Sequence, residues 1–273
     1  MDKPFQINVR ENLKSKNPRL YKFMPGFVLR IFERIVHQKD VNEFLAKHSD
    51  KKGVDFAAIS VKEFGMTVKT FGEEKIPRDG RLIFVANHPM GAMESLAWMT
   101  IIHKYHPNLK FPVNDILLSL GTMNDLFVPI NKHGNQAKES ARLMEEAYAS
   151  DSQLLFYPAG LVSRKIKGKI TDLEWRKNFV SKAVKHQRDV VPVFIDAKNT
   201  DFFYNIARIR KILGIKANIE MLLLPSELYK GRNKTITFTF GEKIPYSQFD
   251  KSKTPAEWAE WVKNKVYNLR DLK

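Results

Sequence analysis

Residues 81–94 read RLIFVANHPMGAME, and they combine a strand, a turn and the start of a helix. The apolar run 82–86 is short and uninterrupted, which is typical of a strand buried on both faces of a parallel sheet. Pro89 and Gly91 then break the strand and permit a tight turn. A helix is predicted over about 94–104. This order of elements predicts a right-handed crossover to a parallel neighbouring strand.

The same alternation of strands and helices continues on both sides of this unit. Further strands are predicted over 61–68, 126–130, 154–157, 190–195 and 235–240. Further helices are predicted over 115–120, 137–149 and 175–186. A last helix begins after Thr254, with Pro255 in its first position, and ends near residue 269. Residues 51–273 are therefore expected to form an α/β domain, with a mostly parallel sheet flanked by helices.

Residues 1–50 are predicted to form an N-terminal helical extension. Helices are expected over about 19–37, with an interruption at Pro25-Gly26, and over 41–47. The apolar side chains of the first helix recur at helical spacing among basic ones; they are Phe23, Phe27, Val28, Ile31, Phe32 and Ile35. The helix either packs on the main domain with a solvated basic face or lies in a membrane interface.

The stretch 202–224 raises the same two alternatives. One helical face would carry Phe203, Ile206, Ile209 and Leu213. Arg208, Arg210, Lys211 and Lys216 lie among them. This helix either covers the sheet or forms a second membrane-facing element beside the site.

The composition narrows the possible functions. The chain has 273 residues, 43% of them hydrophobic, which is enough for a packed core. Lys and Arg number 46 against 30 Asp and Glu, a net charge of +16 that favours a polyanionic partner: nucleic acid, an anionic membrane face or an acidic carrier protein. Cysteine is absent, which excludes disulfides, thiolate metal ligands and an acyl-cysteine intermediate.

Hydropathy bears on the cellular location. No apolar run approaches the roughly 20 residues that a membrane span needs. The charged start MDKPFQINVREN lacks a signal-peptide hydrophobic region. We therefore expect a peripheral protein on the cytoplasmic face of the cell membrane.

The turn after the predicted strand 82–86 carries a candidate catalytic pair. His88 follows the strand end, and Glu94 falls in the first turn of the next helix. The turn could fold the carboxylate back onto the imidazole, which is the base-plus-orienter arrangement that deprotonates a hydroxyl. A purely structural His–Glu pair is the alternative.

A second segment, residues 156–165, reads FYPAGLVSRK after another predicted strand. Gly160 permits close approach of the backbone. Arg164 and Lys165 could bind an anionic headgroup or a phosphate. The alternative is a basic surface turn.

These segments resemble motifs of the lysophospholipid (glycerolipid) acyltransferase superfamily, which implies a glycerolipid-acyltransferase-like fold. Asn87-His88 with Glu94 resembles the first motif, although the family usually has Asp after four residues. The longer spacing is similar to that of the hemolysin-like branch, which includes acyltransferases of ornithine and glycine lipids. Residues 156–165 resemble the third motif, with Ala159 where many members have Glu. Residues 127–132 and 190–195 resemble the second and fourth motifs.

The resemblance implies roles for individual residues. His88 and Glu94 would be catalytic; the substrate-binding set would be Asn87, Lys132, Gly160, Ser163, Arg164 and Lys165. Asp172, Trp175 and Lys177, together with Asn199 and Phe203, also resemble the hemolysin-like branch.

The implied reaction is O-acylation of a lyso-lipid, either lysophosphatidate or an N-acyl amino-acid lipid. Acyl-carrier protein or acyl-CoA would be the donor, and no cofactor is implied. His103 and His106 lack a third ligand, so no metal is expected, and no nucleotide-binding or serine-esterase motif occurs. A basic nucleic-acid-binding protein without catalytic activity is the alternative, suggested by charge alone.

Overall fold

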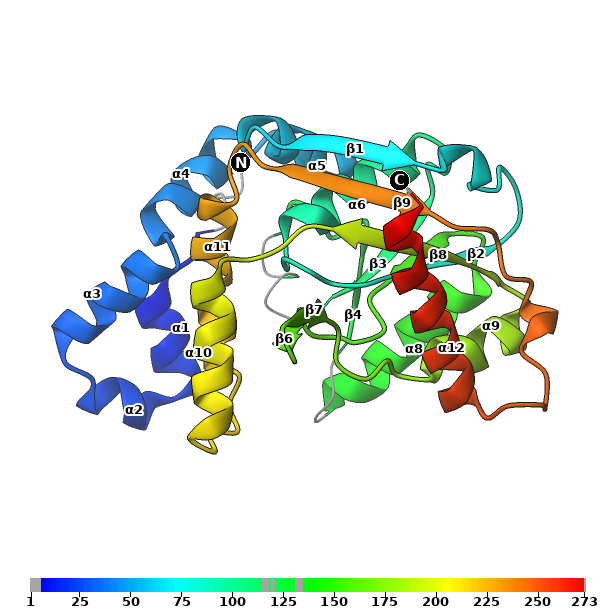
Figure 1. Cartoon of the computed structure of the whole chain (residues 1–273). Helices are drawn as coiled ribbons and strands as arrows, with labels where there is room; N and C mark the ends of the chain where they lie inside the picture. The colour runs from blue at the N-terminus through cyan, green and yellow to red at the C-terminus, as the bar shows by residue number, and fades with distance from the viewer. Residues whose placement is uncertain (1–5, 114–117, 119–120, 131–134, 273) are drawn as a thin grey trace.

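The computed structural model describes residues 6–113, 118, 121–130 and 135–272. Within these residues, seven strands form the central sheet in the order β1-β9-β8-β2-β5-β3-β4 (Figure 1). Neighbouring strands are parallel except β8 and β9, which are antiparallel. The strands are β1 Thr67–Phe71, β2 Leu82–Ala86, β3 Leu109–Val113, β4 Phe127–Pro129, β5 Gln153–Phe156, β8 Asp189–Asp196 and β9 Thr235–Phe240. The predicted α/β fold is confirmed.

Helices cover both faces of this sheet (Figure 1). Strand β2 is buried along its whole length, with Phe84 on the face covered by α5 and α6, and Ile83 and Val85 on the face covered by α8, α9 and α12. Each face of the strand therefore belongs to a separate hydrophobic core. The helices are α5 Gly53–Glu63, α6 Met93–His103, α8 Asn135–Ala149, α9 Asn178–His186 and α12 Pro255–Asn268.

The structure differs from the strand predicted over 61–68. Residues 61–68 were expected to form one strand, but α5 extends to Glu63 and β1 begins only at Thr67. The first part of this segment continues helix α5, because Phe56, Ala57 and Ser60 of that helix fall on one buried face. The helix predicted over 115–120 lies mostly outside the described residues.

The N-terminal helices lie at one end of the sheet, beside α10 and α11 (Figure 1). They are α1 Val9–Lys16, α2 Pro18–Phe23, α3 Gly26–Ile35 and α4 Gln38–Lys47; α10 is Asp201–Ile212 and α11 is Leu224–Lys230. The His37 and Tyr229 rings stack at 4.2 Å, and the Ser226 hydroxyl donates to the Ile35 carbonyl at 2.7 Å. These contacts join the N-terminal helices to α11. A domain boundary at residue 50 stays a prediction.

Buried Arg188 fixes the end of the sheet at which β2 and β8 begin. Its guanidinium donates to the backbone carbonyls of Tyr148 at 2.7 Å and Ser152 at 2.8 Å, and also to those of Leu82, Ala147 and Ser150. Burial, together with the charge of Arg81, lowers the pKa of Arg188 to about 10. A buried charge is tolerated there because its donors are satisfied by carbonyls. One side chain thus connects the starts of β2 and β8 to the end of α8.

Replacing Arg188 by Lys should lower the free energy of unfolding by about 3 kcal/mol, because one ammonium cannot reach all these carbonyls. Thermal and urea denaturation would measure the loss. Arg81→Lys is the matched control, since Arg81 is less buried and donates to only two carbonyls, those of Ala149 and His186. Equal stability of the two variants would contradict this role of Arg188.

Candidate active site

Two loops meet at the carboxyl ends of adjacent parallel strands. Residues 87–92 follow β2, and residues 157–163 follow β5, which pairs with β2. The Ser163 amide donates to the His88 carbonyl at 2.7 Å, so the two loops are in direct contact. This edge of a parallel sheet is where ligands usually bind.

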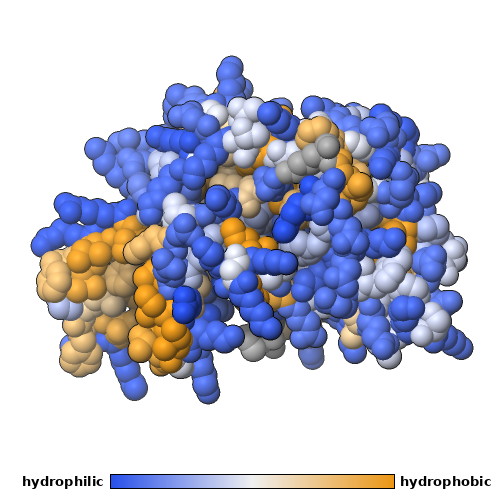
Figure 2. Space-filling view, viewed as in Figure 1, coloured by the Kyte–Doolittle hydropathy of each residue, from blue (hydrophilic) through white to orange (hydrophobic). Residues whose placement is uncertain are grey.

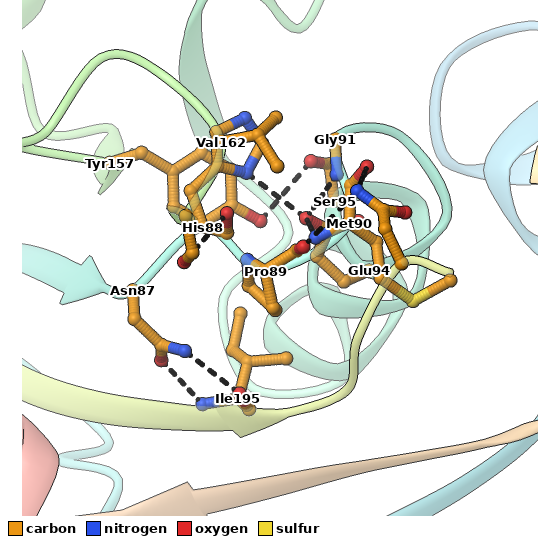
Figure 3. Close-up of polar contacts among 12 residues, drawn as sticks. Asn87, His88, Pro89, Met90, Gly91, Glu94, Ser95, Tyr157, Val162 and Ile195 are labelled. Carbon is orange, nitrogen blue, oxygen red and sulfur yellow. Dashed lines mark hydrogen bonds and ion pairs between the residues drawn. The ribbon is translucent and has the colours of Figure 1, made fainter. Parts of the chain in front are cut away.

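The structure brings the predicted pair His88 and Glu94 together (Figure 3). His88 Nδ1 lies 3.0 Å from Glu94 Oε1, and the same oxygen accepts from the amides of Met90 at 2.9 Å and Gly91 at 2.6 Å. Gly91 has φ +118°, which side-chain-bearing residues rarely adopt, so this turn depends on glycine. The loop is therefore wrapped around one carboxylate oxygen.

The charge state of Glu94 sets the proton position on His88. Burial acts to raise the pKa of Glu94, but the His88 hydrogen bond and charge and the two amides outweigh it, so this pKa lies below its usual range. An ionised Glu94 can only accept, so Nδ1 carries the hydrogen. The lone pair of His88 is then on Nε2, the nitrogen available as a base.

Tyr157 covers one face of the His88 ring. The two rings are stacked, with centroids 3.9 Å apart and 15° between their planes. The Tyr157 hydroxyl lies 3.1 Å from the Ser95 hydroxyl, next to Glu94 on α6 (Figure 3). Tyr157 lies within a motif that the sequence identified, yet no role was predicted for it. Stacking depends on tertiary structure, which one sequence does not reveal.

Asp172 connects the loop after β2 to the loop after β5. Its Oδ1 accepts from the His88 amide at 3.2 Å and from the Ser163 hydroxyl at 2.5 Å, and its Oδ2 accepts from Trp175 Nε1 at 2.9 Å. Burial raises the pKa of Asp172 above its usual value. Ser163, a predicted substrate-binding residue, is thus engaged in holding the loops together.

Asn87 anchors the end of β2 to β8. Its amide donates to the Ile195 carbonyl at 2.8 Å and accepts from the Ile195 amide at 2.7 Å (Figure 3). Both polar ends of this buried side chain are therefore occupied by backbone. This geometry favours a positioning role over the predicted contact with substrate.

Arg164 is buried in an ion-pair cluster. Its guanidinium lies 2.6 Å from Glu220 Oε1, and Arg210 Nε lies 2.8 Å from Glu220 Oε2. Arg164 is 8% exposed and Glu220 is fully buried. The predicted binding of an acceptor by Arg164 stays a prediction, and its guanidinium is already engaged. Glu220 was missed because it lies 56 residues away in the sequence.

The remaining predicted site residues are more peripheral. Lys165 pairs with Asp201 at 2.9 Å on the surface. Gly160 has φ +64°, consistent with its place in a tight turn, and its amide donates to the Tyr157 carbonyl at 2.9 Å. Lys132 lies outside the described residues.

Arg164→Ala should lower the free energy of unfolding by about 3 kcal/mol, because it removes one partner of a buried carboxylate. Lys165→Ala is the matched control on the adjacent residue. Its exposed ion pair should change stability by less than about 0.5 kcal/mol. Melting curves of both variants test this, and an unchanged Arg164→Ala midpoint would show that Glu220 does not depend on Arg164.

A family model described as Acyltransferase matches residues 11–272. A lyso-glycine lipid O-acyltransferase of Bacteroides thetaiotaomicron is 46% identical over 269 residues, covering 98% of this chain and 99% of that protein. A protein of the same name from Phocaeicola vulgatus is 44% identical, covering 98% of this chain and 96% of that protein.

Among solved structures, the 1-acyl-sn-glycerophosphate acyltransferase PlsC of Thermotoga maritima matches with a TM-score of 0.48 and 19% identity. The match covers 79% of this chain and 78% of that one, and it is too weak to bear on function. The family model and the two relatives confirm the superfamily resemblance seen in the motifs. The chain belongs to the acyltransferase family.

Proposed function

We propose that this O-acyltransferase transfers a fatty acyl group to the free hydroxyl of a lyso-glycine lipid. One observation carries the proposal. His88 follows the carboxyl end of β2, and its Nδ1 lies 3.0 Å from the ionised carboxylate of Glu94. The names of two relatives at 46% and 44% identity support the choice of acceptor over lysophosphatidate. The nucleic-acid-binding alternative has no support from the family match.

The proposed reaction is a direct transfer. Nε2 of His88 takes the proton of the acceptor hydroxyl as its oxygen attacks the thioester carbonyl carbon. The tetrahedral intermediate collapses, the C–S bond breaks, and the imidazolium returns the proton to the leaving thiolate. Glu94 stabilises the imidazolium between these steps. Since the chain has no cysteine, no acyl-cysteine forms on the enzyme.

Acyl-carrier protein or acyl-CoA is the proposed donor. Both are anionic and suit a chain with a net charge of +16. Because these donors are supplied in the cytoplasm, we place the enzyme on the cytoplasmic face of the membrane.

An exposed apolar patch supports docking on a lipid surface. We define the patch by Phe23, Phe27 and Ile31 of α2–α3 with Ile212 and Leu213 at the end of α10; Phe23 is 82% exposed and Ile212 72%. Figure 2 shows these elements forming one hydrophobic area with basic side chains beside it. In the part of the chain that the structure describes, no helix is long and apolar enough to cross a bilayer.

The structure corrects two details of the expected membrane face. Phe203 is fully buried and packs in the core, because it lies on the inner side of α10. Arg210 pairs with Glu220 and so faces inward as well. Exposed basic residues on the same helices include Arg30 and Arg34 of α3 and Arg208 and Lys211 of α10.

Purified protein with acyl-carrier protein or acyl-CoA should convert lyso-glycine lipid to the diacyl product, identified by mass spectrometry. Lysophosphatidate in parallel tests the other acceptor. His88→Ala should lower the rate by about 10²–10⁴-fold, the usual effect of losing a general base. A folded His88→Ala protein with near-normal turnover would refute the assignment.

In the same assay, Glu94→Gln should lower turnover less than His88→Ala, because the amide keeps a hydrogen-bond acceptor but loses the charge. Glu94→Asp should retain part of the activity.

The lowered pKa of Glu94 means that its ionised form stabilises the folded protein. This contribution to the free energy of unfolding is fully present at pH values above the usual pKa of Glu. That stabilisation is lost as the pH falls through the folded-state value.

Membrane docking predicts that the protein binds anionic vesicles more strongly than neutral ones, and that salt weakens this binding. Replacing Phe27 and Ile31 by Ser should reduce the salt-resistant part without lowering the melting temperature, since both side chains are about half exposed. Leu29→Ala is the matched control on α3, because Leu29 is buried and its loss should lower stability. Equal sedimentation with both vesicle types at all salt concentrations would refute the electrostatic part.

A further inference from the structure

The Tyr157 ring lies flat against the imidazole that the proposed mechanism uses as its base. The stacking distance is 3.9 Å, with 15° between the planes, so the π face of Tyr157 contacts the ring that becomes positively charged. An aromatic face attracts a cation placed over it, more strongly where water is excluded. His88 has a side chain that is only 14% exposed.

The surroundings hold Tyr157 in this orientation. Its ring packs 5.3 Å from Trp98 of α6 and 5.6 Å, edge to face, from Phe111 of β3. Its hydroxyl is fixed by Ser95 at 3.1 Å. The position of the Tyr157 ring is therefore set by Ser95 and Trp98 of α6 and by Phe111 of β3. None of these residues belongs to the loop that carries His88.

Three titratable groups face His88 from the elements around it. Glu94 of α6 contacts Nδ1, Asp172 accepts from the backbone amide, and Tyr157 covers the ring face. Burial and then the charge of Glu94 raise the pKa of Tyr157 well above its usual value, so its ring is a neutral phenol at neutral pH. A neutral π face adds to the stabilising effect of the Glu94 carboxylate on the protonated ring.

We propose that Tyr157 is a positioning residue for acyl transfer, whose ring face orients His88 and stabilises its imidazolium form. This inference rests on the proposed function, in which His88 accepts a proton as the acceptor oxygen attacks the thioester. Glu94 acts in the plane of the imidazole, whereas Tyr157 acts on its face. Together they hold the ring in two perpendicular directions, which hydrogen bonding to Nδ1 alone cannot do.

The test compares three variants by their pH–activity profiles. Tyr157→Leu should move the acidic limb of kcat/KM to lower pH by about 0.4–1.5, because the imidazolium loses a cation–π contact. The plateau rate should fall by up to about 30-fold. Tyr157→Phe keeps the ring and should stay within about threefold of the unmodified enzyme. Phe111→Leu is the packing control, which should lower the melting temperature without moving the limb.

A second series avoids the possibility that Tyr157→Leu does not fold. Fluorinated phenylalanines at position 157 keep the shape of the ring while progressively weakening its negative face. The acidic limb should move stepwise with fluorination. An unmoved limb in this series would overturn the proposal, and so would a Tyr157→Leu effect equal to that of Phe111→Leu.

A measurement without substrate separates this inference from the proposed function. NMR titration follows the protonation of the His88 ring, whose resonance is assigned by its loss in His88→Ala. The midpoint should move to lower pH along the fluorinated series even if no acceptor is acylated. A shifted midpoint without any turnover would refute the proposed function alone, whereas a fixed midpoint would refute the role of Tyr157.

Discussion

One buried carboxylate oxygen organises the candidate active site. Glu94 Oε1 accepts from the His88 ring and from the amides of Met90 and Gly91. A carboxylate without exposed surface is tolerated only when such donors satisfy it. The turn after β2 is therefore constrained, because a change in its path would remove two amide donors from a buried charge. The tautomer of His88 and the availability of Nε2 both follow from this one constraint.

The fold was largely predictable because its main strands are buried on both faces. The apolar run 82–86 has no polar face, and only a sheet covered by helices on both sides accommodates such a strand. The strand prediction over 61–68 was wrong at its start, because apolar residues near the end of a helix can show the same alternation as a strand. Strands β6 Arg164–Ile166 and β7 Lys169–Thr171 were not predicted, because each has a single apolar side chain and so shows no apolar run.

The site was predictable where residues are close in the sequence and not elsewhere. The pairing of His88 with Glu94 spans six residues, so the turn signals sufficed. Other contacts join residues that are 56 or more positions apart. They are the contacts of His88 with Tyr157 and Asp172 and the pairing of Arg164 with Glu220, and they depend on the packing of whole elements. Arg164 shows what the sequence could not reveal. Its motif suggests a cation free to bind substrate, but in the structure it pairs with the buried carboxylate of Glu220.

The bond pattern of Asn87 has a consequence for how such an enzyme can diversify. Its carboxamide imitates a peptide group and adds one more rung to the ladder between β2 and β8. His88 is the next residue along the loop, so its backbone starts from a point that is hydrogen-bonded to the sheet. Loops around it can change in length or charge while His88 keeps its position relative to the sheet. The fold thus fixes the position of the proposed base separately from the surrounding loops, whose sequence can vary between enzymes with different acceptors.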